Sequence, residues 1–484
     1  MFAFALALSV LAGQPSSAAH PVFTPDQAAN DLAVAREALE RLHPGYDRYA
    51  DRADLDAAWR ALETGAEDGA DLAELYLGLS GLLAEIRCDH TKAELPAPAA
   101  EQWETAPVYP PFRFTLFEGR MFVDVAAPGV DLQRGEEILS LDDEPVADRL
   151  AAARSFMPVD GFTDHVRDLE LAASGEFLGS GFAQFDALLN PDDDQVVLRV
   201  RGLDGAERIV NAPRIGFAAF RDLTGEPRWR NFSDDGAVSV DMIAPGVARL
   251  NVETFVNYRT RVSPTGVFRP IFQRLNAAGV ETLIVDLRRN GGGSTDAQLV
   301  LLAHLTRTAS VRVGDFTIVE SYDFSGLREH IRTWDPSALD PDPERFIALP
   351  DGRFQLSEGV NSLERDIRRA EHAFDGEVVL LTSRANASGV TQMIGALRNQ
   401  DHVTLIGEET GGSQEGPTAG VIWFVELPQS GIVVRVPWWL QISTLADPAF
   451  GRGFQPDIAA RDTYETWLSG RDPALEAAAA FAAR

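Results

Sequence analysis

The sequence predicts an α/β protein with a largely parallel core, preceded by a helical segment and a strand-rich module. Up to about residue 97, apolar residues recur at spacings of three and four, which is typical of amphipathic helices. Short apolar strands follow up to about residue 214. From about residue 246 onwards, strands alternate with helical patterns, which is typical of βαβ units. We therefore expect helices first, then a β module, then an α/β core.

The composition agrees with a chain of several globular domains. Its 484 residues correspond to roughly three domains. Because 45% of the residues are hydrophobic and 24% are charged, a sizeable core is available. The net charge of −30 argues against nucleic acid or anionic membranes as main partners. The predicted boundaries are 20–100 for the helical N-terminal domain, 105–215 for the β module and 235–470 for the core.

Residues 1–19 are interpreted as a secretory signal peptide. The apolar run MFAFALALSVLAG is followed by small residues, with Ser17 and Ala19 at positions −3 and −1 of the expected cleavage site. No Lys or Arg precedes the run, and the run is too short for a stable membrane span. The segment predicts a periplasmic or secreted protein. The single cysteine, Cys88, excludes an intramolecular disulfide.

The periodicity predicts individual elements in each part. In the N-terminal part it predicts helices over 26–42 and within 54–83. In the β module it predicts strands at 112–116, 121–125 and 196–200. The core is expected to contain strands at 247–252, 282–287, 377–381 and 403–406, and helices at 297–305, 362–371 and 390–397. The region 310–360 is expected to be rich in loops.

One segment of the β module is similar to a peptide-binding domain. Residues 134–146, R-G-E-E-I-L-S-L-D-D-E-P-V, resemble the G-D-x-I-L-x-I-N-G-x-P-V segment of PDZ domains. Asp143 stands where that segment usually has its turn glycine. The resemblance implies a module that holds a peptide as an added strand on an open sheet edge.

The segment from Gly376 to Ser388 and Gly389 carries the most specific chemical signal. An apolar strand ends in a small-residue turn, and a helical pattern follows. Unpaired amides and the helix dipole favour negative charge at a helix N-terminus. The Ser388 hydroxyl could therefore attack a carbonyl while the Gly389 N–H stabilises the oxyanion. The structural alternative is that Ser388 only caps the helix, since serine is a preferred N-cap residue.

Two further segments have residues suited to catalysis. The glycine turn 291–293 follows a strand and precedes a helix, so its N–H groups could face a ligand, although a plain tight turn explains it equally well. It lacks the lysine of a phosphate-binding loop. His90, in the segment Cys-Asp-His-Thr at 88–91, could be the base that a serine nucleophile needs. The residues alone do not choose among the eight histidines, the others being His20, His43, His165, His304, His330, His372 and His402.

Together these motifs identify a family. The order V-D-L-R-R-N-G-G-G, V-L-L-T-S-R-A-N-A-S-G and L-I-G-E-E-T-G-G resembles the tail-specific, or C-terminal processing, serine peptidases over residues 246–460. In that family the nucleophile lies 19 residues before the glycine of G-E-x-T, and Ser388 lies 19 residues before Gly407, which selects Ser388 over Ser383. The resemblance implies a β-α spiral core of the ClpP/crotonase type and a peptide or unfolded protein as substrate.

The chain departs from the family pattern at two positions. Ser413 stands where processing peptidases have their catalytic lysine. The D-H-T segment is similar instead to the tricorn-core branch, which implies that His90 is the base. That branch has a glutamate where this chain has Phe450, so Asp89, Ser413 or Glu415 are the candidates for orienting His90. Gly292, by motif register, and Gly389 are the expected oxyanion donors.

The sequence therefore predicts a serine endopeptidase that acts by acyl transfer, and it leaves named alternatives. The missing lysine and glutamate favour a catalytically impaired relative that binds a peptide or a hydrophobic ligand. An esterase would share the chemistry, but the G-x-S-x-G elbow is absent. Cys88 is a weaker candidate nucleophile, and Glu408 and Glu409 are expected to be structural. No His/Cys cluster has metal-ligand spacing, so neither a metal nor an organic cofactor is expected.

Overall fold

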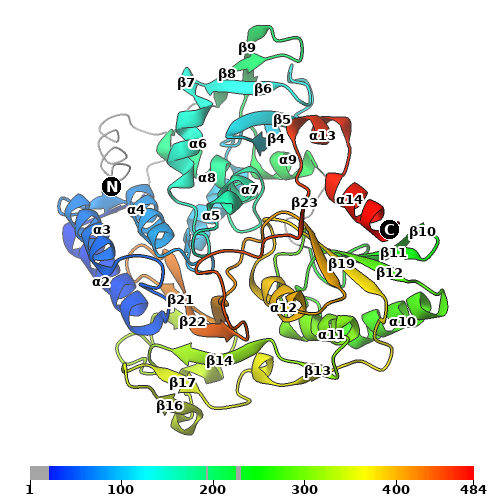
Figure 1. Ribbon diagram of the computed structural model, residues 1–484. Helices are drawn as coiled ribbons and strands as arrows, with labels where there is room; N and C mark the ends of the chain where they lie inside the picture. The colour runs from blue at the N-terminus through cyan, green and yellow to red at the C-terminus, as the bar shows by residue number, and fades with distance from the viewer. Residues whose placement is uncertain (1–20, 192–193, 225–229) are drawn as a thin grey trace.

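The computed structural model describes residues 21–191, 194–224 and 230–484. The proposed signal peptide, 1–19, lies outside the described residues. Figure 1 shows the N-terminal helices, the β module and the α/β core arranged around a shared centre. Among the described helices, none combines the length and the apolar character needed to cross a membrane.

The described N-terminal part is helical, as expected. Its helices are α2 (Pro25–Leu42), α3 (Arg52–Gly65) and α4 (Leu72–Glu85). The helical pattern over 54–83 is split between α3 and α4, because Gly69 turns the chain with a φ of 93° and Asp71 begins α4 with a capping box. The chain then leaves α4 through a partly buried segment at 86–92 that contains His90.

The β module is built on one antiparallel sheet. Its strand order is β4-β5-β6-β8-β9, and the short β7 pairs with β6. The strands are β4 (Phe112–Phe117), β5 (Arg120–Ala126), β6 (Glu137–Leu141), β7 (Glu144–Pro145), β8 (Gln195–Arg201) and β9 (Glu207–Pro213). Asp143, in the place of the turn glycine, has a φ of 65°, a conformation that glycine adopts more readily. The PDZ-like architecture itself stays a prediction.

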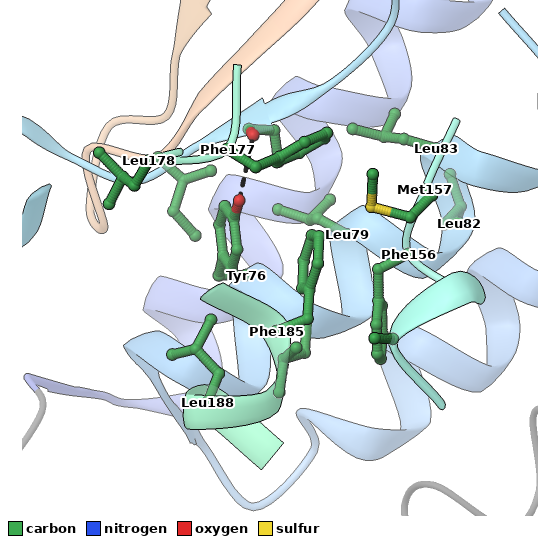
Figure 2. Packing of buried hydrophobic residues seen from close by; sticks show 14 of the residues in the cluster. Tyr76, Leu79, Leu82, Leu83, Phe156, Met157, Phe177, Leu178, Phe185 and Leu188 are labelled. Atoms are coloured by element: carbon green, nitrogen blue, oxygen red, sulfur yellow. Dashed lines mark hydrogen bonds between the residues drawn. The ribbon is translucent and has the colours of Figure 1, made fainter. Parts of the chain in front are cut away.

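Helices accompany this sheet. They are α5 (Ala97–Thr105), α6 (Val146–Arg154), α7 (Arg167–Ala172), α8 (Gly181–Leu189) and α9 (Phe217–Asp222). Helix α8 fixes the module to the N-terminal helices, because Phe185 stacks on Tyr76 of α4 with ring centroids 6.1 Å apart. Figure 2 shows these two rings beside Phe156 in the same apolar cluster. The cluster also contains residues of β21 and β22, so three parts of the chain share one core.

The α/β core has a six-stranded sheet in the order β10-β11-β12-β19-β20-β23. From β11 to β23 all neighbours are parallel, as expected, and only β10 is antiparallel. The strands are β10 (Val238–Ala244), β11 (Val247–Val252), β12 (Thr282–Asp286), β19 (Glu377–Thr382), β20 (Val403–Gly407) and β23 (Ile458–Ala459).

Helices cover both faces of this sheet, as Figure 1 shows. One face packs on α10 (Pro264–Ala277), α11 (Thr295–Leu305) and α12 (Ser388–Arg398), and the other packs on α14 (Pro473–Ala482). Because parallel strands end at one edge, the loops after β12, β19 and β20 meet there. The loop after β12 contains the glycine turn, the loop after β19 leads to Ser388 at the start of α12, and the loop after β20 contains Ser413.

The region 310–360 was expected to be rich in loops, but together with the segment after β20 it builds a second sheet whose described strand pairs are antiparallel. This sheet contains β21 (Thr418–Glu426), β22 (Val433–Ser443), β14 (Gly314–Val319), β15 (Ile331–Arg332), β16 (Phe346–Ala348), β17 (Phe354–Leu356) and, on β22, β3 (Ala93–Glu94). The helix expected at 362–371 is wrong. That segment forms a short 3-10 turn, Ser362–Glu364, and the strand β18, Ile367–Arg368, which pairs with β13, Ser310–Val311.

Candidate active site

Ser388 occupies the first turn of α12 in a strained conformation. Its φ is 51°, a left-handed value that costs a residue with a side chain on the order of 1–3 kcal/mol. The N-cap is Ala387, and no side chain caps this helix. The hydroxyl of Ser388 therefore does not cap the helix. This geometry favours the nucleophile interpretation over the capping alternative, since such strain is concentrated at functional sites.

The glycine turn lies directly against Ser388. A Cβ atom added to Gly292 would lie 3.0 Å from both the Ser388 Cβ and the Gly389 nitrogen, so only glycine fits here without displacing the serine. Gly292 also has a φ of 103°. The two motifs that are far apart in the sequence thus meet as expected, because β12 and β19 are parallel neighbours.

Two buried asparagines hold these loops together. Asn386 Nδ2 donates to Leu287 O at 2.6 Å and to Asn290 O at 2.9 Å. Asn290 Nδ2 donates to Val252 O at 3.1 Å. Both side chains are fully buried. They position the loops on which the serine and the glycines lie, and the motifs R-A-N-A-S-G and R-R-N-G-G-G already contain them.

The predicted oxyanion donors differ in their present partners. The Gly389 N–H donates no hydrogen bond to any part of the chain that the structure describes, as expected for the first turn of a helix. The Gly292 N–H instead donates to Asn290 Oδ1 at 2.9 Å. Gly389 is therefore the free donor beside Ser388, whereas Gly292 would have to share its hydrogen with an oxyanion.

His90 lies in the loop after α4, beside a carboxylate that the sequence analysis did not select. A ring nitrogen of His90, the Asp160 carboxylate and Cys88 Sγ lie within 4.8 Å of one another. His90 Nδ1 and Asp160 Oδ2 are both buried and, within the described residues, neither has a hydrogen-bond partner. Burial raises the pKa of Asp160, while the nearby imidazole of His90 acts to lower it.

Hydrogen bonds connect the loops of His90 and Ser388 through the loop of Asp160. The Asp89 N–H donates to Asp160 Oδ1 at 2.9 Å, and Gly161 N–H donates to Arg87 O at 2.9 Å. Thr163 Oγ1 then donates to Gly411 O at 2.8 Å. The amides of Gly411 and the next residue both donate to Asn386 O at 2.8 Å, two residues before Ser388. The four loops therefore form one bonded unit.

The core carries the decisive family signal. Residues 246–460 match the sequence model of peptidase family S41. The α/β core of this chain is therefore a peptidase family S41 domain. By class, such a chain is a serine-type peptidase and hence a hydrolase.

Solved structures share the fold of this S41 peptidase almost over its full length. A structure of mature CPAF complexed with lactacystin is similar with a TM-score of 0.63 and 15% identity, covering 95% of this chain and 98% of that one. A crystal structure of mature CPAF is similar with a TM-score of 0.64 and 14% identity, covering 95% and 96%. No curated protein matches the chain by sequence.

The three residues predicted to orient His90 have other partners in this S41 peptidase. The Asp89 carboxylate lies 3.2 Å from Lys92 Nζ. Burial would raise the pKa of Asp89, but Lys92 and His90 lower it below its usual range. Ser413 Oγ accepts from the Tyr49 hydroxyl at 3.2 Å, and Glu415 Oε1 accepts from Gly451 N–H at 2.7 Å.

Cys88, Glu408 and Glu409 have structural roles or surroundings that disfavour catalysis. Cys88 is buried, and burial raises the pKa of its thiol to about 12, which disfavours the reactive thiolate. Glu408 pairs with Arg384 at 2.8 Å and Glu409 pairs with Arg452 at 2.6 Å, so these adjacent carboxylates diverge, as expected.

Among the described histidines, His90 alone has a buried ring nitrogen without a partner. His43 is buried and burial lowers its pKa to about 3, so it is neutral; its Nε2 lies 2.8 Å from Thr91 Oγ1. It therefore supports the loop of His90. His304 stacks on Phe272, with ring centroids 4.6 Å apart, and His402 Nε2 lies 2.9 Å from Leu305 O.

Asp160 is the functional candidate that sequence reasoning missed. It lies in a loop of the β module, outside the three family motifs. The sequence contains one weak signal: Asp160 is followed by a glycine, and this dipeptide is typical of a tight turn. Nothing in the sequence pairs this turn with the segment of His90.

Proposed function

We propose that this S41 peptidase is an endopeptidase that cleaves peptides or unfolded proteins through an acyl-enzyme on Ser388. The observation that carries the proposal is the strained Ser388 at the mouth of α12, with an uncapped hydroxyl and the free Gly389 amide beside it. A hydroxyl and an N–H in this arrangement are suited to attack a carbonyl and to hold the resulting oxyanion.

His90 is the proposed general base. It accepts the proton of Ser388 as the Oγ–carbon bond forms, and it returns this proton to the amine as the carbon–nitrogen bond breaks. Water then enters, loses a proton to His90 and releases the acid product. A positioned base contributes about 10²–10⁴ in rate. The hydrogen-bonded connection between the loops of His90 and Ser388 supports this pairing.

Asp160 is the proposed positioning residue for His90. With the proton on Nδ1, the imidazole would present Nδ1–H to the carboxylate and leave Nε2 free to accept from serine. A buried polar atom without a hydrogen-bond partner destabilises the folded protein. A hydrogen bond between His90 Nδ1 and Asp160 Oδ2 would give both atoms a partner. It would also replace the carboxylate that the tricorn-core branch has where this chain has Phe450.

The oxyanion is assigned to Gly389 N–H together with Gly292 N–H. One such donor contributes about 10²–10³ in rate. Because Gly292 already donates to Asn290 Oδ1, the second donor would be shared and hence weaker. We also propose, from the sequence of residues 1–19, that the chain acts in the periplasm or outside the cell.

A fluorophosphonate probe tests the nucleophile, because only an activated serine is modified. Wild-type protein should be labelled on Ser388, and Ser388→Ala should lose both label and hydrolysis of an unfolded fluorogenic peptide. Ser383→Ala is the matched control. Its Oγ donates to Arg288 O at 2.6 Å, so this variant should lose stability but keep the label.

The rival function is a binding protein on the same fold, which the missing lysine favours. Absence of labelling from folded wild-type protein, combined with retained binding of unfolded peptide, would establish it. Hydrolysis of esters without hydrolysis of peptides would indicate an esterase instead.

A further inference from the structure

Three side chains from two distant segments converge beside the proposed active site. Cys88 Sγ, a ring nitrogen of His90 and a carboxylate oxygen of Asp160 all lie within 4.8 Å of one another. Thiolate, imidazole and carboxylate are the ligands that Zn²⁺ takes in proteins. The sequence alone shows no ligand spacing, because Asp160 comes from another loop.

The polar atoms of this cluster lack strong partners. Asp160 is 4% exposed and Cys88 is 3% exposed. Within the described residues, Asp160 Oδ2 and His90 Nδ1 have no hydrogen-bond partner, and the contact of Cys88 Sγ with Thr418 O is long, at 3.7 Å. A buried polar atom without a partner is costly, so each of these atoms is available to a ligand.

The backbone around the cluster is already held in place. Asp160 Oδ1 accepts from Asp89 N–H at 2.9 Å, which leaves Oδ2 as the open carboxylate oxygen. Thr91 N–H donates to Cys88 O at 3.0 Å, and the Thr91 hydroxyl contacts His43. An ion would therefore meet ligands whose loops need little reordering. His90 is only half-buried, which provides an entry path from solvent.

We propose that Cys88, His90 and Asp160 form a Zn²⁺ site that switches the peptidase off. Three protein ligands leave one position of a tetrahedral ion for water. Binding displaces the thiol proton to solvent and occupies His90 and Asp160 together. The inhibitory effect rests on the proposed function, since His90 held by the ion no longer accepts the proton of Ser388. Binding of the ion does not rest on it.

Cobalt binding tests the site without any assay of hydrolysis. Tag-free protein is treated with chelator, desalted and titrated with Co²⁺, and thiolate coordination is detected as a charge-transfer band in the near ultraviolet. We expect one equivalent to bind, one equivalent of Zn²⁺ to displace it, and Cys88→Ser to lose the band. His372→Gln, a change in a histidine outside the cluster, is the control and should bind as wild type does.

Hydrolysis of an unfolded fluorogenic peptide then tests inhibition. Each variant's rate with Zn²⁺ is divided by its own rate with chelator, so an effect of the substitution on the basal rate cancels. Cys88→Ser should raise the half-maximal inhibitory Zn²⁺ concentration by at least about 100-fold, since even outer-sphere partners are worth 10–100-fold in affinity.

The outcomes separate the two proposals. Absence of the cobalt band from folded wild-type protein overturns the zinc site, whatever the hydrolytic activity. A band that Cys88→Ser retains also overturns it. A Cys88-dependent band with an unchanged rate supports the site and overturns its inhibitory role, and with it the assignment of His90 as base. Loss of the Ser388 label from metal-free protein overturns the proposed function alone.

Discussion

A ring nitrogen of His90 lies within 4.8 Å of a carboxylate oxygen of Asp160, and within the described residues His90 Nδ1 and Asp160 Oδ2 are both buried without a hydrogen-bond partner. The two residues come from different parts of the chain, the segment after the N-terminal helices and a loop of the β module. The peptidase core therefore depends on two other parts of the protein for its proposed base and for the group that positions it. On the proposed assignment of His90 and Asp160, activity requires that these parts dock on the core.

Replacing Asp160 by Asn should lower kcat by about 10²–10⁴ with little change in KM. The asparagine keeps the shape and the contact with Asp89 N–H, but it does not stabilise the imidazolium or enforce the tautomer with the proton on Nδ1. Steady-state kinetics with an unfolded peptide check this. Asp164→Asn, an exposed change in the same loop, should leave kcat unaltered. Full kcat in Asp160→Asn would refute the positioning role.

Gly292→Ala should lower kcat at least about 10²-fold, which is the contribution of one oxyanion donor. The new Cβ would meet Ser388 Cβ at 3.0 Å in a backbone with a φ of 103°, so the serine has to move. Gly291→Ala is the matched control. Its added Cβ would meet no atom closer than 3.6 Å and its φ is not left-handed. Equal kcat in the two variants would show that contact with Ser388 is unimportant.

Glu170→Gln should remove a loss of stability that accompanies rising pH. Burial raises the pKa of Glu170 from 4.5 to about 7, so between these values the folded protein binds more protons than the unfolded chain. Stability then falls as pH rises, by up to about 1.4 kcal/mol per pH unit. The urea concentration at the unfolding midpoint, measured between pH 5 and 7, should depend less on pH in the variant. The difference in bound protons between the folded and unfolded states should be smaller by about one.

His43→Gln should remove a loss of stability that accompanies falling pH, the opposite of the dependence at Glu170. Burial lowers the pKa of His43 from 6.5 to about 3, so between these values the unfolded chain binds more protons. Stability is therefore lost as pH falls below about 6.5. In His43→Gln, urea midpoints between pH 4 and 6.5 should depend less steeply on pH, although the variant is less stable at neutral pH. His372→Gln is the control, and a steep slope in His43→Gln equal to that of wild type would contradict the assignment.

The strand predictions of the core were confirmed because its strands are buried on both faces. Such strands are continuous apolar runs, as in β12 and β19, and their signal does not depend on distant residues. The helix predicted at 362–371 is wrong, because the apolar pattern that suggested it extends over only a short segment. Its residues instead pair with β13 or pack on β14. The strands β21 and β22 were not predicted. Strand formation depends on packing against cross-strand neighbours, and here each strand has the other as its long antiparallel neighbour.

The sequence by itself determined the family resemblance of the core and predicted the nucleophile segment and the glycine turn, because each motif is local and its spacing is fixed by the chain. Only the tertiary structure decided that Ser388 is strained and uncapped, that Gly292 lies against it, and that Asp160 stands beside His90. These relationships join residues from separate segments. The Gly292–Ser388 contact is set by the parallel neighbours β12 and β19. The position of Asp160 beside His90 depends on the packing of the N-terminal helices and the β module in one apolar cluster, which no local pattern encodes.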